Sequence, residues 1–443
     1  MSEHVFRHSD VKQKPLDNLH KIDHIVVLML ENRSFDHILG YLKLEAGRKE
    51  VDGLTRSMFN MHNKKKYSVR HLENTKFEQD PGHEENDVAE QLSNNNGGFV
   101  SNFAKHYPDE RDPGKIMGYY NAADLPVYDH LARRFCICDR WFCSVPGSTW
   151  PNRLYALTGQ ADGSKDNKPV PIYSEISFVR HLEERNISWR WYSHDFQTLR
   201  YVDEKYRTAY DQNFFKVEES TMLETQDFLD HCASGDLPAV SWIDPNLVGL
   251  TSFAANDDHP PADMMAAQNL VLTIFSALIA SPAWKKTMFI ITYDEHGGFY
   301  DHVTPPAAAD DDLNFRSYGV RVPALIVSPW VIPGSVSHTV FDHTSIIKTI
   351  LVRFCQEADG SIPDMGARVT NANHLGDLLT LPRPRPTTAR TLPNRLFAQM
   401  ARWQARTWKS KILEQMKVSR RQKKLSEFQQ GLVAAKHRLM ERR

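Results

Sequence analysis

The sequence predicts an α/β fold in which helices cover both faces of a buried sheet. Five short apolar runs are rich in Val, Ile and aromatic residues and do not alternate with polar residues, as expected for strands that are covered on both faces, as in a parallel sheet. Helical patterns lie between these runs, and such alternation indicates a layered α/β domain. The predicted strands are residues 25–30, 187–192, 239–243, 288–293 and 322–328.

The clearest helix is expected over residues 261–280. It begins at the second of two consecutive prolines, Pro260 and Pro261, which the first helical turn tolerates, and continues with good helix formers. Its end is set by Ser281 before Pro282, because the residue before a proline disfavours the helical conformation. The stretches 44–120 and 160–235 are more polar and less periodic, so we expect them to be insertions that form the rim of a site.

Three regions follow one another along the chain. We expect residues 1–380 to form the main domain and residues 381–393, with four prolines, to form a stiff linker. Residues 394–443 hold 14 Lys/Arg and 3 Asp/Glu, although the whole chain has a net charge of −1. A basic amphipathic helix is predicted in this tail, since apolar residues recur there every seven positions. These residues are Val418, Leu425, Leu432 and Leu439, with Phe428 and Ala435 between them.

Composition bears on nucleic-acid binding, secretion, membrane insertion and the state of the cysteines. The near-zero net charge gives no indication of nucleic-acid binding. The first residues contain no apolar run typical of a signal peptide, so a cytoplasmic protein is expected, with a non-classical route as the alternative for export. The sequence contains no run of 18 uninterrupted apolar residues, so no transmembrane helix is expected. The five cysteines are expected to be reduced thiols in the core; a zinc site at Cys136, Cys138 and Cys143 is the alternative, but their spacing matches no common zinc pattern.

Polar side chains follow four of the predicted strands. Ligands bind at the carboxyl ends of strands in an open α/β sheet, so these side chains are candidates for one site. They are Glu31 and Asn32, His194 and Asp195, Asp244, and Asp294 and Glu295. Carboxylates gathered at one edge repel each other, and a divalent cation would offset that repulsion. Oxygen ligands favour Ca, Mg or Mn, and Zn also accepts carboxylates. The alternative is that each acid caps the helix that follows its strand.

A hydroxyl is expected at a helix N-terminus in the segment FCSVPGSTWPNRLY. Pro146-Gly147 makes a turn, and Ser148 or Thr149 then precedes a helical pattern. The free N–H groups of a helix N-terminus favour an anionic group, and a hydroxyl beside a metal ion loses its proton more easily. The alternative is a plain N-cap. His83, His259 and His302 lie in polar loops, where they are either solvated or able to serve a phosphate.

Seven blocks of the sequence resemble one known family. In chain order they are HIVVLMLENRSFDHILGY, DPGHE, DRWFCSVPGSTWPNRLYALTG, SWIDPN, NDDHPPADM, TYDEHGGFYDHV and GVRVPALIVSPWV. Over about residues 20 to 355 the chain resembles the phosphoesterase family of non-specific phospholipases C from plants and bacteria and the related bacterial acid phosphatase. The resemblance implies an alkaline-phosphatase-like three-layer α/β/α core, here with a C-terminal helical tail.

The resemblance also implies residue roles. It implies one divalent ion held by residues that match Glu31, Asn32, Asp294 and Glu295, together with the nucleophile. Because the STWPNR block resembles the plant form, Thr149 is expected to be the nucleophile rather than Ser148. The remaining candidates are His83, His259 and His194 as catalytic histidines, and Asn152, Arg153 and His302 as substrate-binding residues.

Several functions fit these expectations. The first is a metal-dependent phospholipase C that forms a phospho-threonine intermediate and releases diacylglycerol and a phosphorylated headgroup. An acid phosphatase acting on soluble phosphomonoesters is the alternative, and a non-catalytic membrane- or partner-binding protein is a remote one. The basic tail favours a peripheral contact with a membrane surface. Its apolar stripe could equally pack on the acidic body or on a second copy in a homo-oligomer.

Overall fold

The computed structural model describes residues 18–207, 212–217, 227–249, 255–386, 392–417 and 425–441. Its centre is an eight-stranded sheet with the strand order β12-β6-β11-β10-β1-β9-β7-β8. The strands are β1 (His24–Leu30), β6 (Cys136–Cys138), β7 (Trp189–Ser193), β8 (Phe214–Lys216), β9 (Val240–Asp244), β10 (Thr287–Tyr293), β11 (Ala324–Val327) and β12 (Val336–Ser337). All five predicted strands are present.

The sheet is mixed, which corrects the expectation of parallel strands throughout. From β10 to β8 every neighbouring pair is parallel. Residues 322–328, however, give β11, which runs antiparallel to β10 and to β6. The apolar runs predicted burial on both faces correctly, since every residue of β9, β10 and β11 is buried. Burial alone does not specify strand direction, because a covered antiparallel strand is as apolar as a parallel one.

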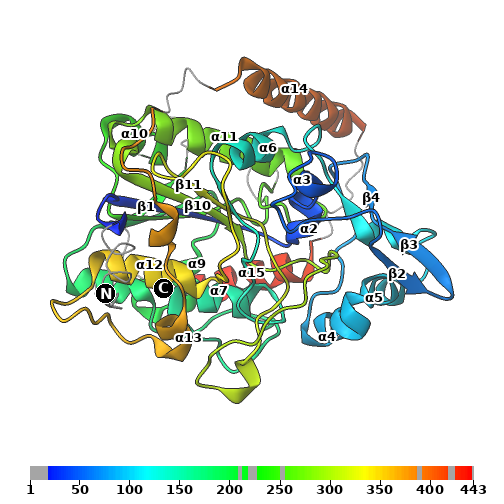
Figure 1. The fold of residues 1–443 in the computed structure, drawn as a ribbon, viewed down its shortest axis with the longest axis horizontal. Coiled ribbons are helices and arrows are strands. Elements are labelled where there is room, and N and C mark those ends of the chain that lie inside the picture. Colours follow the sequence, from blue (N-terminus) through cyan, green and yellow to red (C-terminus); the bar gives the residue numbers. More distant parts are fainter. Residues whose placement is uncertain are drawn as a thin grey trace, which may run out of the picture.

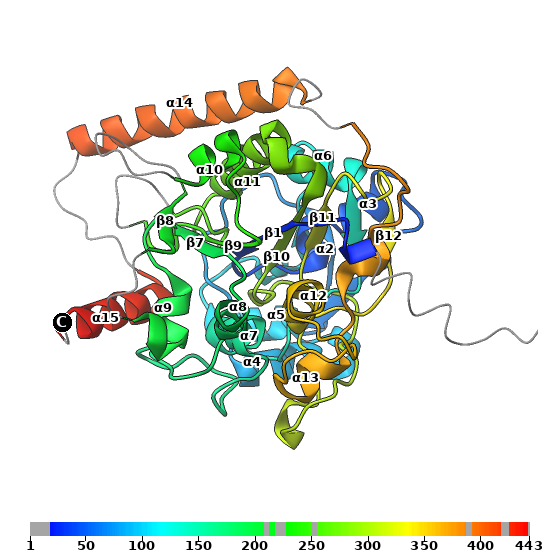
Figure 2. The same cartoon turned by 90° about the vertical axis from the view of Figure 1, so that its left-hand side faces the viewer.

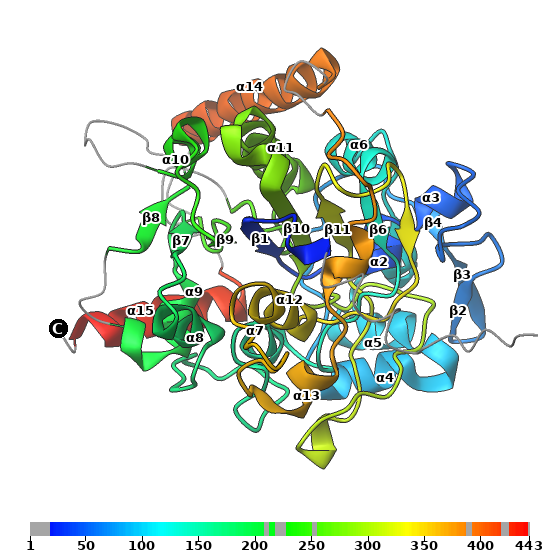
Figure 3. The same cartoon turned by 60° about the vertical axis from the view of Figure 1, so that its left-hand side comes forward.

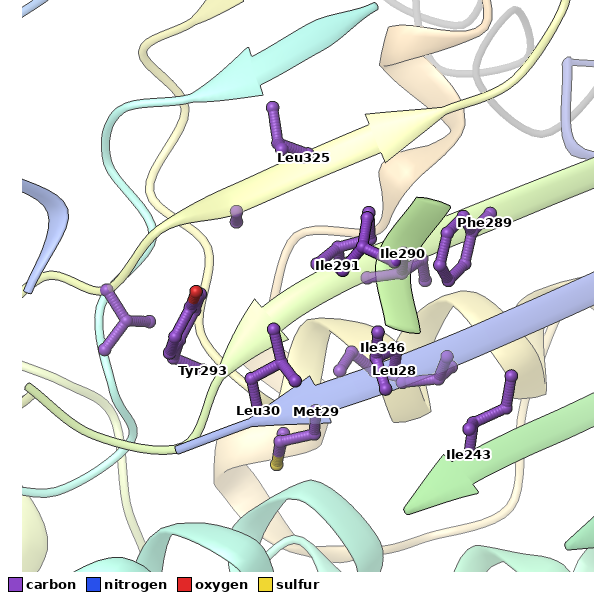
Figure 4. Close-up of a cluster of buried hydrophobic side chains, with 14 of the residues drawn as sticks. Leu28, Met29, Leu30, Ile243, Phe289, Ile290, Ile291, Tyr293, Leu325 and Ile346 are labelled. Carbon is purple, nitrogen blue, oxygen red and sulfur yellow. The ribbon is translucent and has the colours of Figure 1, made fainter. Parts of the chain in front are cut away.

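Helices cover both faces of this sheet (Figures 1 and 3), which confirms the expected three layers. One layer contains α6 (Pro126–Arg134), α10 (Phe228–Ser234) and α11 (Met264–Ala280), and the other contains α7 (Thr149–Thr158), α8 (Phe178–Glu184) and α12 (Thr344–Phe354). Figure 4 shows the side chains of Leu28, Ile290 and Ile291 packed together in the core, with Ile346 of α12 beside them. The central strands are therefore held in place by apolar contacts.

Helix α11 begins three residues later than predicted. The side chain of Asp263 accepts a hydrogen bond from the backbone N–H of Met265 and caps the helix. The two prolines thus lie before the helix rather than in its first turn. The predicted end is confirmed, since Ser281 is the C-cap.

The expected insertions differ from each other. Residues 44–120 form small peripheral elements, as predicted. Residues 160–235 contain β7 and β8, so much of this stretch belongs to the central sheet rather than to a rim. The other elements are α2 (Phe35–Ile38), α3 (Tyr41–Leu44), β2 (Phe59–His62), β3 (Lys65–Ser68), β4 (Arg70–His71), α4 (Glu85–Asn96), α5 (Phe99–His106), β5 (Gly118–Tyr119), α9 (Thr198–Val202) and α13 (Gly366–Asn371).

The basic tail contains two helices, α14 (Asn394–Lys417) and α15 (Glu427–Glu441), rather than one. They lie on opposite sides of the sheet (Figure 2), with α14 beside α11 and α15 beside α9. Of the predicted stripe, Phe428, Leu432 and Ala435 are buried against the body, Leu439 is half-buried, Leu425 precedes α15, and Val418 lies outside the described residues. The stripe therefore packs on the body, which was the alternative to a lipid-facing helix.

Two further expectations bear on the class of protein. In the described part of the chain, no helix is long and apolar enough to cross a membrane. All five cysteines are buried and unpaired, and Cys136 and Cys138 lie in β6, so the prediction of small core thiols is confirmed.

Candidate active site

The carboxyl ends of β1 and β10 bring two predicted pairs of polar residues together. These strands are parallel neighbours, and Leu30 lies opposite Tyr293 at their last paired position. Glu31 and Asn32 therefore emerge beside Asp294 and Glu295. The backbone N–H of Asn32 donates to Asp294 Oδ1 over 3.1 Å. All four side chains are fully buried. The expectation that distant strand ends meet at one edge is confirmed.

A tight backbone turn shapes this edge. Asn32 has a φ of 58°, a left-handed conformation that asparagine tolerates better than most residues. Gly297 packs directly against it with a φ of 62°. A Cβ atom on Gly297 would lie 2.3 Å from the carbonyl oxygen of Asn32. Glycine at position 297 therefore permits the close approach of the two chain segments that follow β1 and β10.

Arg153 lies between the two acidic segments. Its Nη2 donates to Glu31 Oε1 over 2.9 Å and its Nε to Asp294 Oδ2 over 3.3 Å. The side chain is only 1% exposed. The sequence suggested substrate binding for Arg153, but these donors are occupied by the carboxylates. Its role in the structure is to offset their charge and to hold them together.

The acidic cluster of Glu31, Asp294 and Glu295 nevertheless holds more carboxylates than Arg153 can neutralise. Burial raises the pKa of Glu31 well above its usual value; Arg153 opposes this shift, and Asp294, Asp257 and Glu295 add to it. Burial likewise raises the pKa of Asp294 to about 6, although Arg153 lowers it. Glu31 Oε2 and Glu295 Oε1 are buried without a hydrogen-bond partner. Unpartnered carboxylate oxygens in a buried acidic cluster are the environment that a divalent cation requires.

Thr149 is the first residue of α7, as the turn signal predicted. Its Oγ1 lies 3.4 Å from Asn32 Oδ1 and donates to it, so the hydroxyl faces the acidic cluster. Ser148 occupies the N-cap position, but its side chain does not cap the helix and donates instead to Glu84 Oε2. The plain N-cap interpretation therefore fails for both hydroxyls. Of the two, Thr149 is the one that contacts a predicted metal-binding residue.

Asn152 supports the turn that presents Thr149. Its Oδ1 accepts from the backbone N–H of Val145 over 2.9 Å, and its Nδ2 donates to the carbonyl oxygens of Gly147 and Ser148 over 3.1 and 2.9 Å. The sequence suggested that Asn152 binds substrate. In the structure its side-chain amide hydrogen-bonds to the backbone of residues 145–148 and stabilises that turn.

His83 and His259 meet beside Asp80. Their ring centroids are 6.2 Å apart with the planes nearly perpendicular. His259 Nε2 lies 3.7 Å from Asp80 Oδ1 and has no hydrogen-bond partner, although it is buried. The Nδ1 of His83 pairs with the carbonyl oxygen of Pro81 and that of His259 with the carbonyl oxygen of Pro260. With Nδ1 as the donor in each pair, Nε2 of each ring is the atom that can exchange a proton with a substrate.

The two rings differ in charge. Burial alone would lower the pKa of His83, but Glu295, Asp80 and Glu84 raise it to about 9, so this ring is cationic at neutral pH. Burial lowers the pKa of His259, and the effect of His83 adds to this against the opposing charge of Asp80. The pair thus combines one imidazolium with one neutral imidazole near the acidic cluster.

His194 and His302 lie in other surroundings. His194 is half-buried, and burial lowers its pKa to about 4, with Lys216 adding to the shift. Among the described residues it forms no hydrogen bond or ring contact with Thr149, His83 or His259. His302 pairs through Nδ1 with Asp36 Oδ2 at 2.6 Å and through Nε2 with Asp52 Oδ1 at 3.1 Å. Both ring nitrogens of His302 are thus occupied, which does not fit the suggested substrate contact.

Three residues of the site were not singled out from the sequence. Asp80 lies between the two histidines. Asp257 accepts the backbone N–H of Glu31 through its carbonyl oxygen and that of His259 through its Oδ1. His343 Nε2 lies 2.6 Å from the carbonyl oxygen of Asp294. Asp80 and Asp257 lie in the blocks DPGHE and NDDHPPADM. Their closeness in sequence to His83 and His259 could therefore have identified them.

Comparisons with known proteins match most of the chain to one family. The model of the phosphoesterase family matches residues 22–355, close to the range of the seven blocks. Non-specific phospholipase C3 of Arabidopsis thaliana is 33% identical over 74% of this chain and 68% of that protein. Non-specific phospholipase C4 of the same plant is 32% identical over 92% of this chain and 78% of that protein. Non-hemolytic phospholipase C of Pseudomonas aeruginosa is 29% identical over 76% of this chain and 54% of that protein.

Solved structures show more distant likenesses. A protein in the alkaline phosphatase superfamily from Vibrio parahaemolyticus has a TM-score of 0.37 and 12% identity, covering 83% of this chain and 80% of its own. The lipoteichoic acid synthase LtaP from Listeria monocytogenes has a TM-score of 0.38 and 10% identity, covering 81% of each chain. Likenesses this remote indicate no particular function.

Proposed function

Because the chain belongs to the phosphoesterase family and is a hydrolase of phosphoester bonds, we propose that it is a metal-dependent phospholipase C. It would cleave glycerophospholipids to diacylglycerol and a phosphorylated headgroup. The main observation is the hydroxyl of Thr149, which lies at the start of a helix and contacts Asn32 within a buried acidic cluster. The names of the plant and bacterial relatives support the lipid substrate.

The residues present fit one divalent ion. Glu31, Asn32, Asp294, Glu295 and Thr149 would hold it, since Arg153 binds both Glu31 and Asp294, Thr149 Oγ1 contacts Asn32 Oδ1, and two carboxylate oxygens lack partners. When bound, such an ion supplies positive charge to a phosphoryl oxygen and favours ionisation of a neighbouring hydroxyl. Oxygen donors fit Ca, Mg, Mn or Zn.

Thr149 acts as the nucleophile in this proposal. After its hydroxyl has released a proton to solvent, Oγ1 attacks phosphorus as the alkoxide, and the bond from phosphorus to the diacylglycerol oxygen breaks. The product of this step is a phospho-threonine that carries the headgroup. Oγ1 returns to the alkoxide form when its bond to phosphorus breaks in the second step.

In this proposal His83 stabilises charge and His259 transfers protons. His83 is already cationic and stabilises the phosphoryl oxygens. A phosphate anion bound beside both rings raises the pKa of His259 as well, because nearby negative charge favours the imidazolium. His259 then gives its Nε2 proton to the departing alkoxide. In the second step it takes a proton from the attacking water, the bond from Thr149 Oγ1 to phosphorus breaks, and the phosphorylated headgroup leaves.

The nucleophile is tested by a pair of substitutions. Thr149→Ala should lower kcat by about a thousandfold or more, because removal of a covalent nucleophile usually costs at least that much. Ser148→Ala is the matched control, since that hydroxyl binds Glu84, and it should retain most activity. Mass spectrometry of acid-quenched wild-type enzyme should find the phosphorylated peptide at Thr149. Turnover by Thr149→Ala within about tenfold of wild type rejects this role.

The substrate class is tested on the chelated enzyme. Phosphatidylcholine, phosphatidylethanolamine and p-nitrophenyl phosphate are assayed after EDTA treatment, with Ca, Mg, Mn and Zn added back in turn. We expect activity to disappear on chelation and to return with one ion, and the two lipids to be better substrates than the monoester. A preference for p-nitrophenyl phosphate would identify a phosphomonoesterase instead.

A further inference from the structure

The C-terminal helix α15 contacts the candidate active site directly. The ring of Phe428 stacks on the imidazole of His259, with centroids 6.0 Å apart and planes inclined by 16°. The same ring lies 6.2 Å from the indole of Trp150, the residue after Thr149. Phe428 is only 5% exposed. A residue of the tail thus touches both a proposed catalytic histidine and the neighbour of the proposed nucleophile.

Several contacts hold α15 in this position. Gln429 Nε2 donates to the carbonyl oxygen of Leu247 over 3.0 Å. The ammonium of Lys436 lies 5.4 Å from the ring centroid of Phe196. Leu432 and Ala435 are fully buried on the same face of the helix. Because these contacts are spread along the helix, its placement does not depend on the Phe428 ring alone.

The imidazole of His259 depends on its surroundings for its orientation. Nδ1 pairs with the carbonyl oxygen of Pro260, but Nε2 has no partner, so hydrogen bonding fixes only one side of the ring. His83 presents its ring at a nearly perpendicular angle, and the Phe428 ring lies nearly parallel to the imidazole. A flat apolar ring packed parallel to the imidazole limits its tilt.

We propose that α15 is part of the active site and that Phe428 is a positioning residue for His259. This inference rests on the proposed function, in which His259 gives its proton to the leaving alkoxide. Phe428 does no chemistry itself. Its ring keeps Nε2 of His259 directed at the leaving oxygen, so its removal should slow only those reactions in which the leaving group needs a proton.

The test compares two leaving groups in single-turnover experiments. The diacylglycerol of a short-chain phosphatidylcholine leaves as an alkoxide and needs a proton, whereas p-nitrophenyl phosphorylcholine releases a stable phenolate and does not. Phe428→Ala should slow the lipid reaction by about 10-fold to 100-fold, the usual effect of a misplaced catalytic group, and the nitrophenyl reaction by less than about threefold. Phe428→Tyr keeps the aromatic face and should restore the lipid rate.

Two controls separate positioning from loss of structure. Met440 lies on the same helix and is 62% exposed, so Met440→Ala should change neither rate. Hydrogen exchange of residues 427–441 reports whether α15 stays docked. If Phe428→Ala releases the helix, Phe428→Leu keeps apolar bulk without a flat ring and should give the same selective loss.

The outcomes test the positioning role of Phe428 separately from the proposed function. Should His259→Ala lose rate selectively on the lipid while the Phe428 variants behave as wild type, the proposed function stands and the positioning role is overturned. Equal losses on both substrates in a Phe428 variant with α15 docked also overturn it. If His259→Ala itself shows no dependence on the leaving group, the proton donor of the proposed function is wrong.

Discussion

At the scale of single residues, Arg153 explains how three buried carboxylates coexist without unfolding the site. Its Nη2 and Nε atoms donate to Glu31 and Asp294, which offsets part of their charge and links the ends of β1 and β10. One arginine cannot balance three acids, and Glu295 relies instead on histidines. Burial alone would raise the pKa of Glu295, but His83 and His296 lower it below its usual value. The charge left over is the reason to expect a cation.

His302 shows the opposite case, a half-buried histidine that is paired with two carboxylates. Burial would lower its pKa, but Asp36 and Asp52 raise it to about 10. Because the folded pKa exceeds the usual 6.5, the charged ring contributes stability below about pH 6.5 and loses this contribution as pH rises towards 10. We predict that His302→Gln lowers the free energy of unfolding most at pH 6 and least near pH 10. Urea titrations of both proteins at several pH values measure this difference, and a gap that widens with pH would contradict the assignment.

The residues that sequence reasoning identified are those that directly follow predicted strands or lie in the seven blocks. Glu31, Asn32, Asp294 and Glu295 met as expected, because parallel register aligns the ends of neighbouring strands. The suggested roles of Asn152 and Arg153 do not match their contacts, since sequence shows that a polar residue is near a site but not which partner it has. Asp80 and Asp257 were missed because their position depends on loops, whose paths a sequence pattern does not encode.

At the scale of elements, the chain segments after β1 and β10 must approach closely for the acidic cluster to form. We predict that Gly297→Ala lowers activity about tenfold or more, because the new Cβ displaces the carbonyl of Asn32 and with it the predicted ion-binding residues. The positive φ should also cost about 1 kcal/mol of stability. Steady-state kinetics and thermal unfolding measure the two effects.

Gly235 provides the matched control for this substitution. It too has a positive φ, of 77°, but a Cβ there meets only Pro282 at 3.4 Å, far from the acidic cluster. Gly235→Ala should lose only the free energy of unfolding that the positive φ costs, and it should keep its activity. An equal loss of activity in both variants would show that strain, rather than the contact with Asn32, is responsible.

The elements also show where prediction from sequence ends. The buried strands were found because their apolar runs are continuous, and the mixed direction of the sheet was not, because burial is the same in either direction. The three-residue strands β6 and β8 and the two-residue strand β12 are too short to give a pattern. Their place follows from pairing with β11, β7 and β6, which is a tertiary contact.

At the scale of the whole molecule, the tail separates its apolar and basic surfaces. The stripe of α15 is buried on the body, whereas Arg395, Arg402 and Arg406 on α14 are exposed. Any contact of the tail with a membrane would therefore use charge rather than the apolar stripe. Such a contact requires anionic lipid and weakens with salt, since the screening length falls from about 10 Å at 0.1 M to about 3 Å at 1 M.

This separation predicts how the protein behaves with liposomes. It should sediment with vesicles that contain phosphatidylserine at low salt, and not with pure phosphatidylcholine vesicles or at 1 M salt. Each basic residue near an anionic surface contributes about 1 kcal/mol, so replacing all three arginines of α14 by Gln should weaken binding about 100-fold. The control removes the same charge from the body by replacing Lys64, Lys65 and Lys66, which are exposed on the β2–β3 hairpin. Equal effects of the two triple variants would mean that net charge, and not the surface of α14, governs the contact.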